Sequence, residues 1–283
     1  MAIHPHIGRI MLSPMPSPKL KQNSPIVFLK APLNILPPFL TKHIKYCKIF
    51  IIYYVLYIKM VIVMKKDVKK EKYNEIRKED IPTLIKILEN YYKDAKCSLE
   101  YDTPLQLVVA LILAAQCTDE RVNKIVPILF EKFPDCKSLA NANIEDIEKI
   151  VKPCGFYKNK AKSISETANI ILNNFNGNVP NNMKDLCTLK GIGRKSSNII
   201  MQECFGNTVG IAVDTHVTRI SRKIGLSNKA TPEKIEQELM KKVDKKYWNK
   251  INHIFVYHGR AICIARHPKC DICPVAIICK QNK

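Results

Sequence analysis

From about residue 80 onward, apolar side chains recur every three or four positions, which is the spacing of one face of an α-helix. The first such helix is predicted to start at Asp80, and its apolar positions are Ile81, Leu84, Ile85 and Leu88. The segment 104–116 is apolar nearly all round, which is typical of a central buried helix. No alternating strand pattern extends over more than a few residues, so we predict an all-α fold.

Further helices are predicted between segments that contain proline or glycine breakers. Thr118 is expected to cap a helix that runs to about Lys132. The later helices are expected at 144–152, 157–174, 182–189, 194–205, 215–224, 231–243 and 246–263.

The first 64 residues have a different pattern. They hold eight Lys or Arg residues and no Asp or Glu, and their longest apolar run, 49–58, is shorter than the ~20 residues that a membrane-spanning helix needs. Three interpretations remain open. The extension could be upstream sequence included through a wrongly assigned start codon, in which case translation starts at Met60 or Met64. It could instead be an organelle-targeting segment or a weak membrane anchor. We exclude it from the fold.

Charge and cysteine content narrow the function. The net charge is +21, and the chain beyond the extension is still basic, which favours an anionic polymer such as nucleic acid over a merely lysine-rich surface. Seven of the eleven cysteines are scattered singly through apolar surroundings. This distribution indicates an intracellular, reducing compartment rather than a disulfide-bonded secreted protein.

A glycine turn precedes the helix predicted at 194–205. Gly191 and Gly193 lack a Cβ and leave backbone N–H groups accessible to a phosphate. Lys195 follows in the first helical turn, where the positive end of a helix dipole favours an uncharged, nucleophilic amine. The spacing fits neither a P-loop nor a dinucleotide-binding fingerprint. Two interpretations remain: a segment that grips a nucleic-acid backbone and attacks a sugar, or an ordinary helix-turn-helix with an exposed lysine.

Four cysteines near the C-terminus form a second motif with the spacing C-x6-C-x2-C-x5-C, at Cys263, Cys270, Cys273 and Cys279. Thiols this close in sequence can converge on one metal centre. Both a four-thiolate zinc site and an iron–sulfur cluster are compatible with a C-x2-C pair. The loop between the first two cysteines is basic and includes Lys269, so a metal that fixes this loop would present charge to phosphate.

Four separated segments together resemble the endonuclease III family of DNA glycosylases. They are Ala115–Asp119 with Val122–Lys124, the hairpin Leu189–Lys195, Val213–His216, and His258–Arg260 followed by the four cysteines. The resemblance covers the chain from about Asp80 to Lys283. It implies an all-α fold of two lobes: a helical-barrel lobe, 97–208, that carries the helix-hairpin-helix, and a [4Fe–4S] cluster lobe, 65–96 with 209–283. DNA would bind in the cleft between the lobes.

The same resemblance assigns roles residue by residue. It implies that Lys195 is the nucleophile, that Asp214 is the catalytic carboxylate, and that Gln116 enters the DNA beside the extruded base. It implies that the four cysteines bind a [4Fe–4S] cluster, which we favour over zinc. Asp214 is also well placed to cap the following helix. Arg194, Arg260 and Lys269 are candidates for DNA contact, as are Gly191 and Gly193 through their backbone.

The implied function is a bifunctional DNA glycosylase and abasic-site lyase of base excision repair. It would remove oxidised pyrimidines from duplex DNA through a lysine Schiff base, as a monomer without an obligatory protein partner. Two rivals are mismatch-specific glycosylases, for adenine or for thymine; the adenine enzymes typically lack a lysine at position 195. A rival of another class is a non-catalytic iron–sulfur protein that binds DNA or senses redox state, which would need neither Lys195 nor Asp214.

Overall fold

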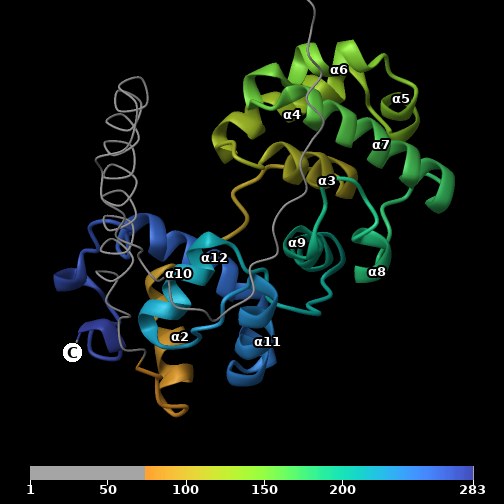
Figure 1. The fold of residues 1–283 in the computed structure, drawn as a ribbon. Coiled ribbons are helices and arrows are strands. Elements are labelled where there is room, and N and C mark those ends of the chain that lie inside the picture. Colours follow the sequence, from red (N-terminus) through yellow and green to blue (C-terminus); the bar gives the residue numbers. More distant parts are fainter. Residues whose placement is uncertain (1–73, 283) are drawn as a thin grey trace, which may run out of the picture. The chain divides into compact units, whose positions relative to one another are not determined.

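The computed structural model describes residues 74–282, which Figure 1 draws as a coloured ribbon. The three interpretations of residues 1–64 concern a segment outside the described residues. Every regular element between residues 74 and 282 is an α-helix or a short 3-10 helix. The prediction of an all-α fold is therefore confirmed for the described chain. None of the helices in this range is long and apolar enough to span a bilayer.

The α-helices are α2 (Asp80–Tyr91), α3 (Pro104–Leu113), α4 (Asp119–Lys132), α5 (Cys136–Ala140), α6 (Ile144–Val151), α7 (Tyr157–Phe175), α8 (Met183–Leu186), α9 (Arg194–Phe205), α10 (Thr215–Ile224), α11 (Pro232–Lys242) and α12 (Trp248–Ala261). The 3-10 helices are η1 (Lys152–Cys154), η2 (Lys245–Tyr247), η3 (Cys270–Ile272) and η4 (Lys280–Asn282).

A first hydrophobic core is built from residues between Leu99 and Ala212. At its centre lies α3, in which every side chain from Leu107 to Leu113 is buried. Helix α3 packs against α4, α7 and α9. The prediction that this apolar segment forms a central buried helix is confirmed.

A second core joins the two ends of the described chain. Helix α2 lies beside α12, which in turn packs against α10 (Figure 1). The apolar face predicted for the first helix is buried here, at Ile81, Leu84, Ile85 and Leu88. Both cores belong to one compact unit of the chain.

The helix limits differ from the prediction in informative places. Helix α3 ends at Leu113, three residues early, because the chain turns through Gln116, whose φ is +54°. Thr118 precedes α4 as predicted, but its side chain makes no capping hydrogen bond. The short helix α5 was not predicted, since five residues are too few to display a helical period.

Candidate active site

One cavity of about 140 Å³ brings the two predicted catalytic side chains together. Lys195 reaches it from α9 and Asp214 from the start of α10, while Arg260 of α12 and Asp119 of α4 form part of its wall. Lys195 and Asp214 lie 19 positions apart in the chain and in different elements. The fold therefore places an amine and a carboxylate in one pocket, which is the arrangement that nucleophilic attack with charge stabilisation requires.

The glycine turn before α9 has two differently constrained glycines. Gly191 has φ +79°, and a Cβ there would lie 3.3 Å from Ile112 Cγ1, so both conformation and space favour glycine. The Thr167 hydroxyl fixes the turn by donating to the Lys190 carbonyl at 2.9 Å. Gly193 is extended and precedes α9 without a side-chain cap, and a Cβ added there would have no neighbour within 4 Å. The start of α9 thus has no side-chain cap and there is open space beside Gly193, which suits an anion site.

Asp214 is the N-cap of α10. Its Oδ1 accepts a hydrogen bond from the Val217 backbone N–H at 2.7 Å, which confirms the predicted capping role. The side chain is partly exposed and lines the pocket of Lys195, so the cap also holds the carboxylate in place.

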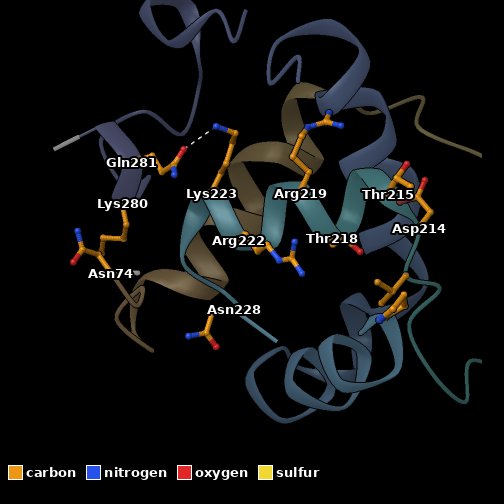
Figure 2. A pocket seen from close by; sticks show the side chains of 12 residues that line it. Asn74, Asp214, Thr215, Thr218, Arg219, Arg222, Lys223, Asn228, Lys280 and Gln281 are labelled. Atoms are coloured by element: carbon orange, nitrogen blue, oxygen red, sulfur yellow. Dashed lines mark hydrogen bonds between the residues drawn. The ribbon is translucent and has the colours of Figure 1, made fainter. Parts of the chain in front are cut away.

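A larger groove of about 770 Å³ begins at Asp214 and follows α10 past Arg222 to Lys280 (Figure 2).

Asp119 and Arg260 meet at the rim of the pocket. Arg260 donates to Asp119 Oδ2 at 2.8 Å, and the Ser98 hydroxyl donates to the same oxygen at 2.6 Å. Burial alone would raise the pKa of Asp119, but the hydrogen bonds from Ser98 and Arg260 outweigh it and hold that pKa below its usual value. Asp119 belongs to the segment 115–119 that resembles the endonuclease III family, but no place in this pocket was predicted for it.

Arg194, a predicted DNA contact, is engaged within the protein. Its Nε donates to Glu236 Oε2 at 2.5 Å, and a terminal nitrogen donates to Glu236 Oε1 at 3.2 Å. The Glu236 side chain is 3% exposed, whereas that of Arg194 is 48% exposed. The guanidinium therefore has an intramolecular partner and still reaches the surface, and its contact with DNA stays a prediction.

Gln116 and Phe156 line a second pocket, of about 210 Å³, beside Gly191. Both have left-handed backbones, with φ of +54° and +47°, and the Phe156 ring is 65% exposed. An exposed aromatic residue in this conformation is costly for folding alone. Phe156 was not predicted as a site residue; the signal that could have found it is the breaker segment Pro153–Gly155 immediately before an aromatic residue.

The four C-terminal cysteines line one small cavity, of about 40 Å³, between α12 and the end of the chain. Burial raises the pKa of the Cys263 and Cys273 thiols, a penalty that coordination of the thiolates to a metal would offset. Within residues 74–282, no group of three or more His, Cys, Asp or Glu side chains is arranged to hold a metal ion. The donor set and its shared cavity nevertheless fit a thiolate-ligated group.

The chain around the first cysteine is held by Arg219 of α10, which donates to the carbonyls of Gly259 at 3.1 Å and Cys263 at 2.9 Å. A Cβ at Gly259 would lie 2.6 Å from His216 Nδ1 and 2.7 Å from the Arg219 guanidinium. The absence of a Cβ at Gly259 thus leaves room for the His216 and Arg219 side chains of α10 against α12. Lys269, in the loop between Cys263 and Cys270, is exposed.

Comparisons with known proteins agree with this geometry. Residues 109–245 match the model of the HhH-GPD superfamily base excision DNA repair proteins. The chain is 43% identical over 203 residues to endonuclease III of Synechocystis sp., an alignment that covers 72% of this chain and 93% of that protein. The chain belongs to the endonuclease III family. It is therefore a base excision DNA repair protein.

Solved structures of endonuclease III have the same fold. A non-covalent endonuclease III–DNA complex has a TM-score of 0.69 and 33% identity, covering 73% of this chain and 97% of that one. A trapped endonuclease III–DNA covalent intermediate has a TM-score of 0.70 with the same identity and coverage. The family relationship thus extends over nearly the whole length of these relatives.

Proposed function

We propose that this endonuclease III family member is a bifunctional DNA glycosylase and abasic-site lyase that removes oxidised pyrimidines from duplex DNA. The observation that carries the proposal is the shared pocket of Lys195 and Asp214. A binding protein needs neither side chain there. The trapped covalent complex of a structural relative supports a covalent step in this family.

The chemistry follows from these two side chains. After the damaged nucleotide has been flipped out of the duplex, the Lys195 Nζ lone pair forms a bond to C1′ of the sugar and the bond from C1′ to the base breaks. The base leaves with the bonding electrons, and Asp214 stabilises the positive charge that develops on the sugar. The bond from C1′ to the ring oxygen then breaks, the leaving base and the ring oxygen take up the two protons that Nζ loses, and a Schiff base between Nζ and C1′ remains. Removal of a proton from C2′ then expels the 3′ phosphate.

DNA binding is proposed for the open surface around this pocket. The uncapped start of α9, with Gly191 and Gly193, offers backbone N–H groups to phosphate. Arg194, Arg260 and Lys269 would add positive charge, and the exposed Gln116 and Phe156 would fill the gap left by the flipped nucleotide.

We also propose the lobe boundaries 97–208, and 65–96 with 209–283. The two separate hydrophobic cores support this division of the chain into two lobes.

The four cysteines are proposed to bind a [4Fe–4S] cluster. The support is the cavity that all four line, together with membership of the endonuclease III family. Such a cluster would supply a rigid covalent anchor for the loop that carries Lys269. Iron and sulfide analysis of anaerobically purified protein tests this assignment: about four of each per chain are expected, and a colourless protein that contains zinc would overturn it.

The activity is tested by trapping with borohydride, which reduces a Schiff base to a stable amine. Duplex DNA that contains thymine glycol should give a covalent adduct with the wild-type protein and none with Lys195→Gln. Asp214→Asn should bind the duplex but form adduct at least about 100-fold more slowly, as expected from loss of one charge-stabilising group. Tight binding of the damaged duplex by wild type without any adduct would establish the non-catalytic alternative. A preference for an undamaged mismatch would establish the mismatch glycosylase.

A further inference from the structure

Lys160, in the first turn of α7, is a buried lysine without an acidic partner. The residue is 5% exposed, and its Nζ donates to the carbonyls of Leu113 and Cys154, each at 2.8 Å. Among residues 74–282, no carboxylate lies within ion-pair distance of this ammonium group. Burying a charged group costs free energy unless hydrogen bonds compensate for it. The two carbonyls that accept from Lys160 therefore point to its role.

The two acceptors belong to the two segments that lead to Gln116 and Phe156. Leu113 is the last residue of α3, three positions before Gln116, and Cys154 is the last residue of η1, two positions before Phe156. The last carbonyls of a helix lack partners within the helix and attract a positive charge. One ammonium group therefore joins the ends of both segments across a separation of 41 residues in the chain.

The two segments share a conformational feature that needs such support. Gln116, Phe156 and Asn176 are the non-glycine residues with positive φ in the described part of the chain, and the first two line one pocket with Lys160. Left-handed backbone at a non-glycine residue persists only where the surrounding contacts hold it. Phe156 and Gln116 are both exposed, so their own side chains supply little of that support.

We propose that Lys160 is a positioning residue: its bridge between Leu113 and Cys154 fixes the spacing of Gln116 and Phe156, so that both enter the DNA together and keep the damaged nucleotide extrahelical. This inference rests on the proposed function, because it assigns the two side chains to the gap in the duplex. Lys160 acts through these residues and touches neither the substrate nor Lys195. Replacing Lys160 should therefore slow the reaction most on substrates in which a base pair must be opened.

The test compares two substrates in single-turnover experiments with cluster-loaded protein. Lys160→Met keeps the length of the side chain and removes its donors. We expect base release from a thymine glycol duplex to slow at least tenfold, while cleavage of a preformed abasic site, which needs no base pair opened, slows less than threefold. The matched control is Lys162→Met, because Lys162 lies on the same helix with a side chain that is 72% exposed. The control should match wild type on both substrates.

A second comparison separates a positioning role of Lys160 from a general loss of folding. In protein that carries Gln116→Ala and Phe156→Ala, adding Lys160→Met should slow base release less than twofold further. A full tenfold additional loss, or equal losses on both substrates, would overturn the inference. If Lys160→Met does not fold, Lys160→Gln, which keeps a donor on a shorter chain, is taken through the same comparisons. If wild type forms no Schiff base, the proposed function fails; if wild type is active and Lys160→Met is unaffected, only this inference fails.

Discussion

Arg194 and Glu236 form a two-point ion pair that connects α9, the helix of Lys195, to α11. Both guanidinium-to-carboxylate contacts are present, and Asn198 Nδ2 donates to the same Glu236 Oε1 at 2.8 Å. A Cβ at Gly210 would lie 2.3 Å from that oxygen, so the chain must have glycine there to let the carboxylate approach. Because Lys195 directly follows Arg194, this contact fixes the start of α9 relative to the second core, which contains Val213 next to Asp214.

Replacing Glu236 with Gln should therefore weaken both stability and catalysis. Loss of the buried charge leaves the Arg194 guanidinium poorly paired, which costs about 1–3 kcal/mol in the free energy of unfolding. We expect the thermal midpoint to fall by about 2–12 °C, by the scaling of about 2–4 °C per kcal/mol for a folded chain of this size. Adduct formation should slow more than DNA binding weakens. Glu131→Gln, at an exposed position on α4, is the control; equal effects of the two substitutions would contradict the assignment.

Asp119→Asn tests the pocket wall. Because the pKa of Asp119 lies below its ordinary value, the carboxylate is ionised throughout the working range, and wild type should show no change in rate between pH 5 and 8 that is due to this group. The substitution leaves Arg260 with a weaker acceptor, and we expect single-turnover base release to slow about tenfold, the factor that corresponds to about 1.4 kcal/mol. Ser98→Ala removes one donor to the same oxygen and should have a smaller effect in the same assay. A larger effect of Ser98→Ala would argue that Asp119 is not the important acceptor.

Local signals account for the helices that were predicted well. Helix α9 lies between Gly193 and Gly206, and α10 lies between the capping Asp214 and Gly225, so both ends of each are encoded within a few residues. The pairing of Arg194 with Glu236 joins residues 42 positions apart and has no such signal. Phe156 likewise follows no hydrophobic period. Long-range packing decides the ion pair, whereas the local signal for Phe156 is the breaker segment before it rather than a hydrophobic period.

Lys195 and Asp214 were singled out because each lies in a local motif, a glycine turn and a helix cap, and because the family resemblance implies a catalytic role for both. Asp119 was named only within the segment 115–119 that carries the resemblance, and no contact was predicted for its side chain. Its contact with Arg260 spans 141 positions and depends on how α12 packs. The wall of the pocket could therefore not be predicted from the sequence, whereas Lys195 and Asp214, which line the same pocket, were both singled out there.

Glu203 gives the fold a measurable dependence on pH. The hydrogen bond from the His253 ring is the largest influence that lowers the pKa of Glu203 below its ordinary 4.5, and Tyr101 donates to the same carboxyl group at 3.1 Å. A carboxyl group with a lowered pKa in the folded state stabilises that state at pH values above the unfolded pKa, and this stabilisation is lost as pH falls through the lowered value. Glu203→Gln should thus be less stable than wild type at pH 7, by about 1–3 kcal/mol.

The difference in stability between wild type and Glu203→Gln should narrow only as pH is lowered below about 4.5, because the folded wild-type carboxylate becomes protonated at its lowered pKa. Thermal midpoints of both proteins across this range provide the measurement. Glu131→Gln, at an exposed position, serves as the control and should follow wild type at every pH. A gap for Glu203→Gln that stays constant on acidification would mean that the carboxyl group is not ionised in the folded protein.

Gly259→Ala should loosen the loop that begins at Cys263. The added methyl would collide with His216 and with the Arg219 guanidinium, which holds the Gly259 and Cys263 carbonyls. Displacement of Arg219 leaves the C-terminal end of α12 without this donor, and the thiol of Cys263 loses its fixed position. We expect visible absorbance of the proposed cluster to decay at least threefold faster in air.

Gly206→Ala is the control: Gly206 has φ +61° and no neighbour within 4 Å of an added Cβ, so the backbone is strained without any collision near the cysteines. Equal decay in the two variants would show that general destabilisation, rather than the Arg219 contact, releases the cluster.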